Sequence, residues 1–200
     1  MISIGLTGSI GMGKSTVLDM FKELGAKVWS ADEAVHRLYA RGGAAVAAMG
    51  AEFPGCVVGG AVDRDRLSRL ILGDPEKFAR AEAIIHPLVA DDREKFLKKA
   101  KKSGARLAVL DIPLLFEKGY ETGFDAVVVV SAPAEVQRRR VLARPGMHAE
   151  KFEEILKRQT PDAEKRRRAD YVVSTDQSLA ATLDEVRRIV TELENRSFGR

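Results

Sequence analysis

The sequence is poor in cysteine and in aromatic residues, and it contains no long apolar run. Its one cysteine, Cys56, excludes an internal disulfide framework and fits a reducing compartment. No apolar stretch approaches the roughly 20 residues that a membrane-spanning helix needs. Met1 leads into a strand-like run without the basic start and cleavage site of a secretory signal. We therefore expect a cytoplasmic protein that does not contact a membrane.

The charge of the chain is concentrated in one segment. Of its 200 residues, 45% are hydrophobic and 31% are charged, a mixture typical of one globular domain, and the net charge is +4. Residues 135–168 hold eleven Lys and Arg against six Asp and Glu. A basic stretch of this kind suits a polyphosphate ligand as well as a nucleic acid, so charge alone leaves both open.

Short apolar runs alternate with helical patterns along the chain. Strands are expected at 2–7, 27–29, 106–111, 124–131 and 171–174. Helices are expected at 15–24, 133–143, 149–159 and 178–195, and another from Asp74-Pro75 to 102 that is interrupted at His86-Pro87. The segment 42–60, rich in glycine and alanine, is the least regular. The alternation predicts an α/β fold with a doubly wound parallel sheet of about five strands.

One phosphate-binding motif is complete. Residues 8–15 read Gly-Ser-Ile-Gly-Met-Gly-Lys-Ser, which matches G-x-x-x-x-G-K-[ST] between a strand and a helix and indicates a fold of the P-loop NTPase type. Glycines let the backbone N–H groups turn toward phosphate, and Lys14 is expected to reach the β- and γ-phosphates. Ser15 and Asp111, the latter at the end of an apolar strand, are expected to ligate Mg²⁺. The predicted loop contacts with ATP are Gly8, Gly11, Met12, Gly13, Lys14, Ser15 and Thr16.

Three classes of P-loop protein compete: a small-molecule kinase, a GTPase switch and an ATPase acting on nucleic acid. No D-x-x-G follows Asp111 and no N-K-x-D occurs, which speaks against a GTPase. Aromatic residues are 6% of the chain, and the basic segment contains only Phe152, which speaks against nucleic-acid stacking.

A kinase needs an acceptor base and cations for the transferring phosphoryl group. Asp32 follows the strand 27–29, and Arg140 and Arg144 are spaced i and i+4 for one helical face. Helix capping by Asp32 and a solvated basic face for the arginines remain open alternatives, and the Arg166-Arg167-Arg168 run is expected to be solvated surface. The kinase interpretation is favoured, with another P-loop nucleoside or nucleotide kinase as the runner-up.

Together these motifs resemble the dephospho-CoA kinase family over nearly the whole chain. Residues 5–17 are similar to its P-loop, and residues 111–117, Asp-Ile-Pro-Leu-Leu-Phe-Glu, match its D-x-P-L-L-[FY]-E signature, the most specific of the motifs. Further matches are Ser30-Ala31-Asp32 to D-A-D, Val62-Asp63-Arg64 with Leu67 to V-D-R-x-x-L, residues 85–89 to I-x-H-P-x-V, Gln137 with Arg140 and Arg144 to Q-x-x-R-x-x-x-R, and, in register, Gln159 and the strand 169–173.

The resemblance implies transfer of the ATP γ-phosphoryl group to the ribose 3′-hydroxyl of dephospho-CoA with Mg²⁺, the last step of coenzyme A synthesis. It implies one domain in three parts: a core of residues 1–31, 103–132 and 169–200, a helical CoA-binding part of about 32–102, and a lid of about 133–168. The partners would be ATP and dephospho-CoA and no nucleic acid. We expect a monomer, with a small homo-oligomer open.

The resemblance also assigns roles to residues. It places Asp32, Lys14 and Arg140 in catalysis, adds Arg140, Arg144 and Thr175 to the ATP contacts, and places Asp32, His86, Pro87, Asp111, Leu114, Leu115 and Glu117 at the acceptor substrate. For His86 alone, a helix break with a packed imidazole is the favoured explanation. Two positions depart from the family: Ser30 replaces its first D-A-D aspartate, and Thr175 replaces an asparagine near the adenine.

Overall fold

The computed structural model describes residues 1–198, with side chains through Arg196. The chain forms two compact units, one of Met1–Val28 with the chain from Ala100 onward, and one of Trp29–Lys99. Each unit has its own hydrophobic core. Among the described residues no helix is long and apolar enough to cross a membrane.

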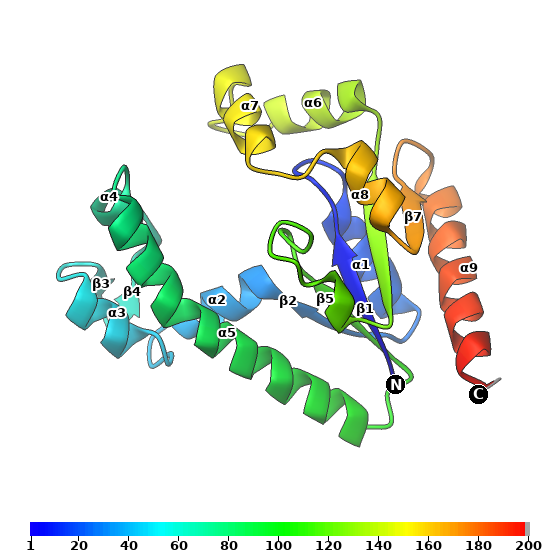
Figure 1. Ribbon diagram of the computed structural model, residues 1–200, viewed down its shortest axis with the longest axis horizontal. Coiled ribbons are helices and arrows are strands. Elements are labelled where there is room, and N and C mark those ends of the chain that lie inside the picture. The colour runs from blue at the N-terminus through cyan, green and yellow to red at the C-terminus, as the bar shows by residue number, and fades with distance from the viewer. Residues whose placement is uncertain (199–200) are drawn as a thin grey trace. The chain divides into compact units, whose positions relative to one another are not determined.

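A five-stranded sheet organises the first unit, in the order β2-β5-β1-β6-β7 (Figure 1). Its strands are β1 (Ile2–Thr7), β2 (Lys27–Ser30), β5 (Leu107–Asp111), β6 (Ala126–Ser131) and β7 (Tyr171–Ser174). β1 runs parallel to β5 and to β6, and β6 runs parallel to β7. The predicted α/β sheet is therefore confirmed. Parallel pairing brings the carboxyl ends of these strands to one edge, where ligands bind in such folds.

The first unit contains several helices and one long segment besides this sheet. The helices are α1 (Lys14–Glu23), α6 (Ala134–Leu142), α7 (Ala149–Lys157), α8 (Asp162–Arg168) and α9 (Leu179–Phe198). α1 and α9 pack on each other and on β1, and α8 contacts β6. On the face of β1 that carries Gly5, residues 112–124, which include the 3₁₀ helix Glu121–Gly123, approach closely. A Cβ atom on Gly5 would lie 2.7 Å from Leu115 Cδ1, so only glycine fits there.

The second unit is mostly helical. It contains α2 (Ala31–Tyr39), α3 (Val46–Glu52), the hairpin β3 (Val57–Val58) and β4 (Ala61–Val62), α4 (Arg64–Ile71) and most of α5 (Pro75–Lys102). The turn of the hairpin is Gly59-Gly60, both with positive φ, as a tight two-residue turn requires. The segment 42–60 is thus more regular than expected, because its alanines and glycines form α3 and this hairpin. The helix α8, which ends in the run Arg166-Arg167-Arg168 that was expected to be solvated surface, was not predicted.

The predicted interruption of α5 at His86-Pro87 is wrong. α5 runs unbroken through Pro87. Pro87 lacks only one donor to the helix, and residues 84, 85, 88 and 89 on either side pack in the core of the second unit. Packing of that apolar face therefore outweighs the local preference of the proline. The predicted start is confirmed, since Asp74 Oδ1 accepts from the N–H groups of Glu76 and Lys77 at 3.1 and 3.0 Å.

Candidate active site

The glycine-rich loop between β1 and α1 has a backbone that other residues could not adopt. Gly11 and Gly13 have φ of 78° and 86°, in the left-handed region. A Cβ on Gly8 would lie 2.6 Å from the carbonyl oxygen of Val130, a backbone atom of β6. The helix α1 starts at Lys14 with Gly13 at its N-cap, so its free N–H groups face the loop. The loop has the form of an anion-binding site at a helix N-terminus.

Lys14 and Asp111, which were predicted from separate motifs, meet at this site. Lys14 Nζ is bonded to Asp111 Oδ1, and the side chains are 16% and 8% exposed. The register of the sheet explains the contact: Asp111 ends β5 opposite Leu6 of β1, directly before the loop. The arrangement holds a cation and a carboxylate together at the edge of the sheet, beside the loop.

The side chains of Ser15 and Asp111 suit a magnesium ion. Ser15 is exposed in the first turn of α1, next to Lys14, and provides a hydroxyl oxygen, while Asp111 provides a carboxylate. Mg²⁺ takes hard oxygen ligands and is usually bound through one or two side chains together with phosphate oxygens. The residues present therefore fit this ion.

Arg140 reaches the loop through Thr175. Its Nη1 donates to Thr175 Oγ1 at 2.9 Å and its Nη2 to the Thr175 carbonyl at 2.5 Å. The Thr175 hydroxyl in turn donates to the carbonyl of Met12 at 2.8 Å. The structure thus brings Arg140, Thr175 and Met12 together. The side chains of Arg140 and Thr175 are both hydrogen-bonded within the protein. The predicted ATP contacts of these residues stay predictions.

The helical argument for Arg144 is wrong, although its role stays a prediction. α6 ends at Leu142 with Ala143 as its C-cap, so Arg144 lies beyond the helix and does not share its face with Arg140. Pro145 and Gly146 follow immediately; both disfavour a helix, and Gly146 has a φ of 72°, in the left-handed region, which accounts for the early end. The side chain of Arg144 is exposed.

Two predicted acceptor-site residues contact other parts of the chain instead. Leu115 is fully buried and packs beneath Gly5, so it offers no surface to a substrate. Glu117 Oε1 accepts from the N–H of Thr160 at 2.7 Å and lies 2.9 Å from Lys165 Nζ. Leu114, in contrast, is 38% exposed. Substrate contact by Leu115 and Glu117 therefore finds no support in the structure.

The remaining predicted residues lie in the second unit. Asp32 is the second residue of α2, and its side chain is exposed. The cap of this helix is Ser30, whose hydroxyl accepts from the N–H of Glu33, so the alternative that Asp32 is the cap is wrong. His86 is half-exposed with Nε2 3.4 Å from Glu82 Oε1, and Pro87 is exposed, so the expected packed imidazole is also wrong.

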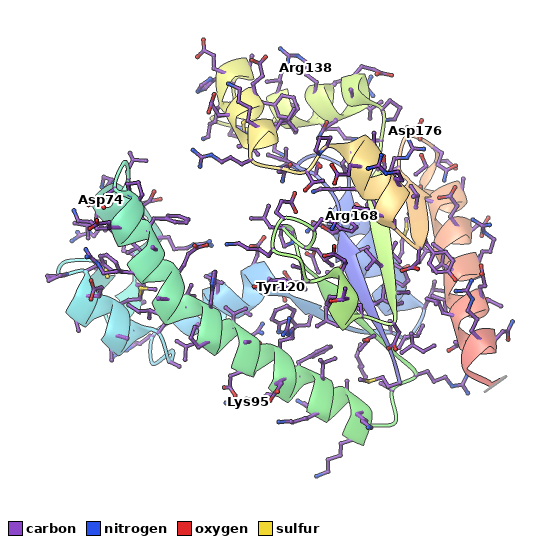
Figure 2. The ribbon with its side chains drawn as sticks, in the orientation of Figure 1. Asp74, Lys95, Tyr120, Arg138, Arg168 and Asp176 are labelled. Carbon is purple, nitrogen blue, oxygen red and sulfur yellow. The ribbon has the colours of Figure 1, made fainter. Side chains whose placement is uncertain are left out.

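Sequence reasoning missed the polar residues that tie α8 to the core. Lys165 has no exposed side-chain surface, although it begins a run of four basic residues. Arg168 is bonded to Glu121 and lies over the ring of Phe116 at 4.6 Å; Figure 2 shows it on α8. The pKa of Glu121 is held below its usual range by a hydrogen bond from the backbone N–H of Glu121 itself and by the Arg168 guanidinium. In the sequence, the pairs Lys165–Glu117 and Arg168–Glu121 are indicated only by the presence of two glutamates four positions apart, Glu117 and Glu121.

Fold and loop together define a P-loop kinase: a parallel sheet, a phosphate-binding loop, and a lysine, a carboxylate and an arginine gathered around it. Residues 2–181 match the family model described as dephospho-CoA kinase. A dephospho-CoA kinase of Mesorhizobium japonicum is 55% identical over 196 residues, which are 98% of each chain. The chain belongs to the dephospho-CoA kinase family, and it is an ATP-dependent kinase.

Solved structures agree in fold. A crystal structure of a protein from Thermus thermophilus is similar at a TM-score of 0.81 and 37% identity, covering 96% of each chain. A dephospho-CoA kinase from Campylobacter jejuni is similar at a TM-score of 0.73 over 98% of each chain, at 24% identity. The second likeness shows the fold alone.

Proposed function

We propose that this protein transfers the γ-phosphoryl group of ATP to the ribose 3′-hydroxyl of dephospho-CoA, giving coenzyme A and ADP. Family membership over nearly the whole chain supports the reaction. The observation that carries its location is the Lys14–Asp111 pair beside the loop 8–16. The lysine of this motif reaches the phosphates of ATP in P-loop proteins, so the pair supports an ATP site at this loop.

Catalysis of this transfer depends on positioning and on neutralised charge. Lys14 would bind the β- and γ-phosphates, and its bond to Asp111 holds the ammonium group beside the loop. Arg140, fixed through Thr175, would neutralise charge on the transferring group. Asp32 would accept the proton of the 3′-hydroxyl. The hydroxyl oxygen then forms the new bond to the γ-phosphorus as the bond between that phosphorus and ADP breaks.

Ser15 and Asp111 would hold Mg²⁺. When bound, the ion supplies positive charge that offsets the charge of the phosphates. Further parts of the proposal are a CoA-binding part at about residues 32–102 and a lid at about 133–168.

A product assay tests the reaction directly. The protein is incubated with ATP, Mg²⁺ and dephospho-CoA, and the products are analysed by mass spectrometry. We expect coenzyme A, heavier than the acceptor by one phosphoryl group, and no product with a Lys14→Met variant. Phosphorylation of a nucleoside or nucleotide instead, with dephospho-CoA unchanged, would contradict the proposal.

A further inference from the structure

Two glutamine side chains hold the backbone of one residue of the phosphate loop, Ile10, from outside. Gln137 Nε2 donates to the carbonyl of Ile10 at 2.8 Å, and the N–H of Ile10 donates to Gln159 Oε1 at 3.2 Å. Because a backbone carbonyl only accepts and a backbone N–H only donates, the partners fix which end of each amide is nitrogen. Both backbone polar groups of Ile10 are therefore satisfied by side chains. Gln137 lies within α6, and Gln159 follows the end of α7.

The helix α6 is also packed directly against the loop. A Cβ on Gly11 would lie 2.5 Å from Val141 Cγ2 and 3.2 Å from the Gln137 carbonyl. Val141 is fully buried and Gln137 is 5% exposed. Figure 2 shows Arg138 on the other side of α6, where its side chain is about half exposed. The face of α6 that carries Gln137 and Val141 is thus a fixed wall of the loop.

The backbone of Ile10, which the glutamines hold, precedes the phosphate-binding groups. A P-loop binds phosphate through backbone N–H groups, and here those of Gly11, Gly13 and Lys14 follow Ile10, while the N–H of Met12 donates to the carbonyl of Ser9 at 3.2 Å. The Ile10 carbonyl shares its peptide plane with the N–H of Gly11, so rotation of that peptide would turn this N–H group, and glycines on both sides of Met12 offer little resistance. A loop that samples other conformations binds its ligand more weakly in proportion to the lost competent fraction.

We propose that Gln137 and Gln159 are positioning residues for ATP, which fix the backbone of Ile10 on both sides of its Cα and thereby the direction of the N–H groups that bind phosphate. The inference rests on the proposed role of the loop in ATP binding. It assigns no contact with ATP to either glutamine. It does assign the segment around α6 and α7 a task in shaping the loop that binds ATP.

The test replaces each glutamine by the unbranched apolar side chain of similar length, in the full chain. We expect Gln137→Met and Gln159→Met each to raise the Kd and the KM for ATP by about tenfold, the size of one lost hydrogen bond. The KM for dephospho-CoA should stay within about twofold of the unchanged protein. In the double variant the loss should be smaller than the product of the two, because both act on the backbone of one residue.

The third glutamine of the chain is a matched control. Gln177 also donates its amide to a backbone carbonyl, that of Ser174 at 3.2 Å, but it is exposed. Gln177→Met should leave ATP binding unchanged. Calorimetric titration with ATP and thermal unfolding are measured on all variants. If the buried Gln137→Met variant fails to fold, the half-buried Gln159 tests the proposal alone.

The outcomes separate this inference from the proposed function. Unchanged ATP affinity in folded glutamine variants, while Lys14→Met loses ATP, would overturn the inference and keep the loop as the ATP site. Unchanged ATP affinity in Lys14→Met would instead remove the loop from ATP binding. Equal losses for ATP and dephospho-CoA, in step with a lower unfolding temperature, would show that the glutamines only support the fold.

Discussion

Asp32, the residue that we propose as the acceptor base, does not serve as the cap of its helix. Its carboxylate is exposed in the first turn of α2, and Ser30 already caps that helix. Ser30 stands where the family has an aspartate, so the departure from the family motif has a structural role here. The carboxylate of Asp32 is left available for a substrate.

The variant Asp32→Asn keeps the shape of this side chain and removes its ability to accept a proton. We expect turnover to fall by about 10² to 10⁴, the usual contribution of a general base, with ATP affinity unchanged. Steady-state kinetics and calorimetric titration with ATP measure the two effects. The neighbouring exposed carboxylate Glu33 is the control, and Glu33→Gln should turn over normally. Normal turnover in Asp32→Asn would remove this residue from the mechanism.

Gly11 combines two demands that can be separated by substitution. Its φ of 78° disfavours any side chain, and a Cβ would collide with Val141. Gly104 has nearly the same φ, 73°, with no atom within 4 Å of the Cβ position. Gly104→Ala therefore measures the backbone cost alone, about 1 to 2 kcal/mol.

We expect Gly11→Ala to cost about 1 to 3 kcal/mol more than Gly104→Ala, because it also overpacks the contact between the loop and α6. Urea unfolding of the two variants gives the difference in the free energy of unfolding. ATP affinity should fall in Gly11→Ala only. Equal costs would mean that α6 yields freely and is no wall of the loop.

At the scale of elements, the sequence predicted best those strands and helix ends that depend on a short local pattern. The apolar runs gave strands of the predicted extent at β1 and β7, and Gly25, with φ of 91°, ends α1 as predicted. Those features depend on neighbours along the chain. Lys165 and the glutamine bonds to Ile10 could not be predicted in this way, because their partners lie 48 and more than 120 positions away.

Helix α5 shows why a strong local signal failed. Pro87 removes a donor and disfavours the helical form of His86, yet the helix continues because its apolar face packs in the core of the second unit. The proline thus destabilises a helix that packing maintains. Its cost should be measurable.

Pro87→Ala restores the missing donor to the carbonyl of residue 83 and removes the clash of the ring. We expect the free energy of unfolding to rise by about 1 to 3 kcal/mol, up to the helix-interior difference between the two residues. Chemical denaturation followed by circular dichroism gives the value. Ala90→Pro, at an exposed position one turn later in α5, should have the opposite sign. A loss of stability in Pro87→Ala would mean that the ring itself makes a needed contact.

At the scale of the molecule, the segment from α6 to α8 belongs to the same compact unit as the sheet and is fixed to it at both ends. Near α6, Gln137 binds the loop and Arg140 binds Thr175. At α8, Asp162 accepts from the hydroxyl of Ser131 at 2.7 Å, and Lys165 pairs with Glu117. In the lid that we propose at about 133–168, closure would therefore involve the part between these ends, which contains α7, more than α6 or α8.

The Glu117–Lys165 pair is a buried connection, with 13% and 0% of the side chains exposed. Lys165→Met leaves the Glu117 carboxylate without a counter-ion, and we expect a loss of about 3 to 5 kcal/mol in the free energy of unfolding. Adding Glu117→Gln removes the uncompensated charge and keeps an oxygen for the Thr160 N–H, so the double variant should recover most of that loss. Urea unfolding of the two single variants and the double variant measures the coupling.

The exposed ion pair Lys157–Glu154 is the control for the lysine substitution. Because water and salt screen such a pair, Lys157→Met should leave the free energy of unfolding nearly unchanged. The contrast between the two lysines isolates burial as the cause. If Lys165→Met were as stable as Lys157→Met, or if Glu117→Gln failed to restore it, the pair would not be what holds α8 to the core, and the anchoring would have to come from Asp162 and Arg168 instead.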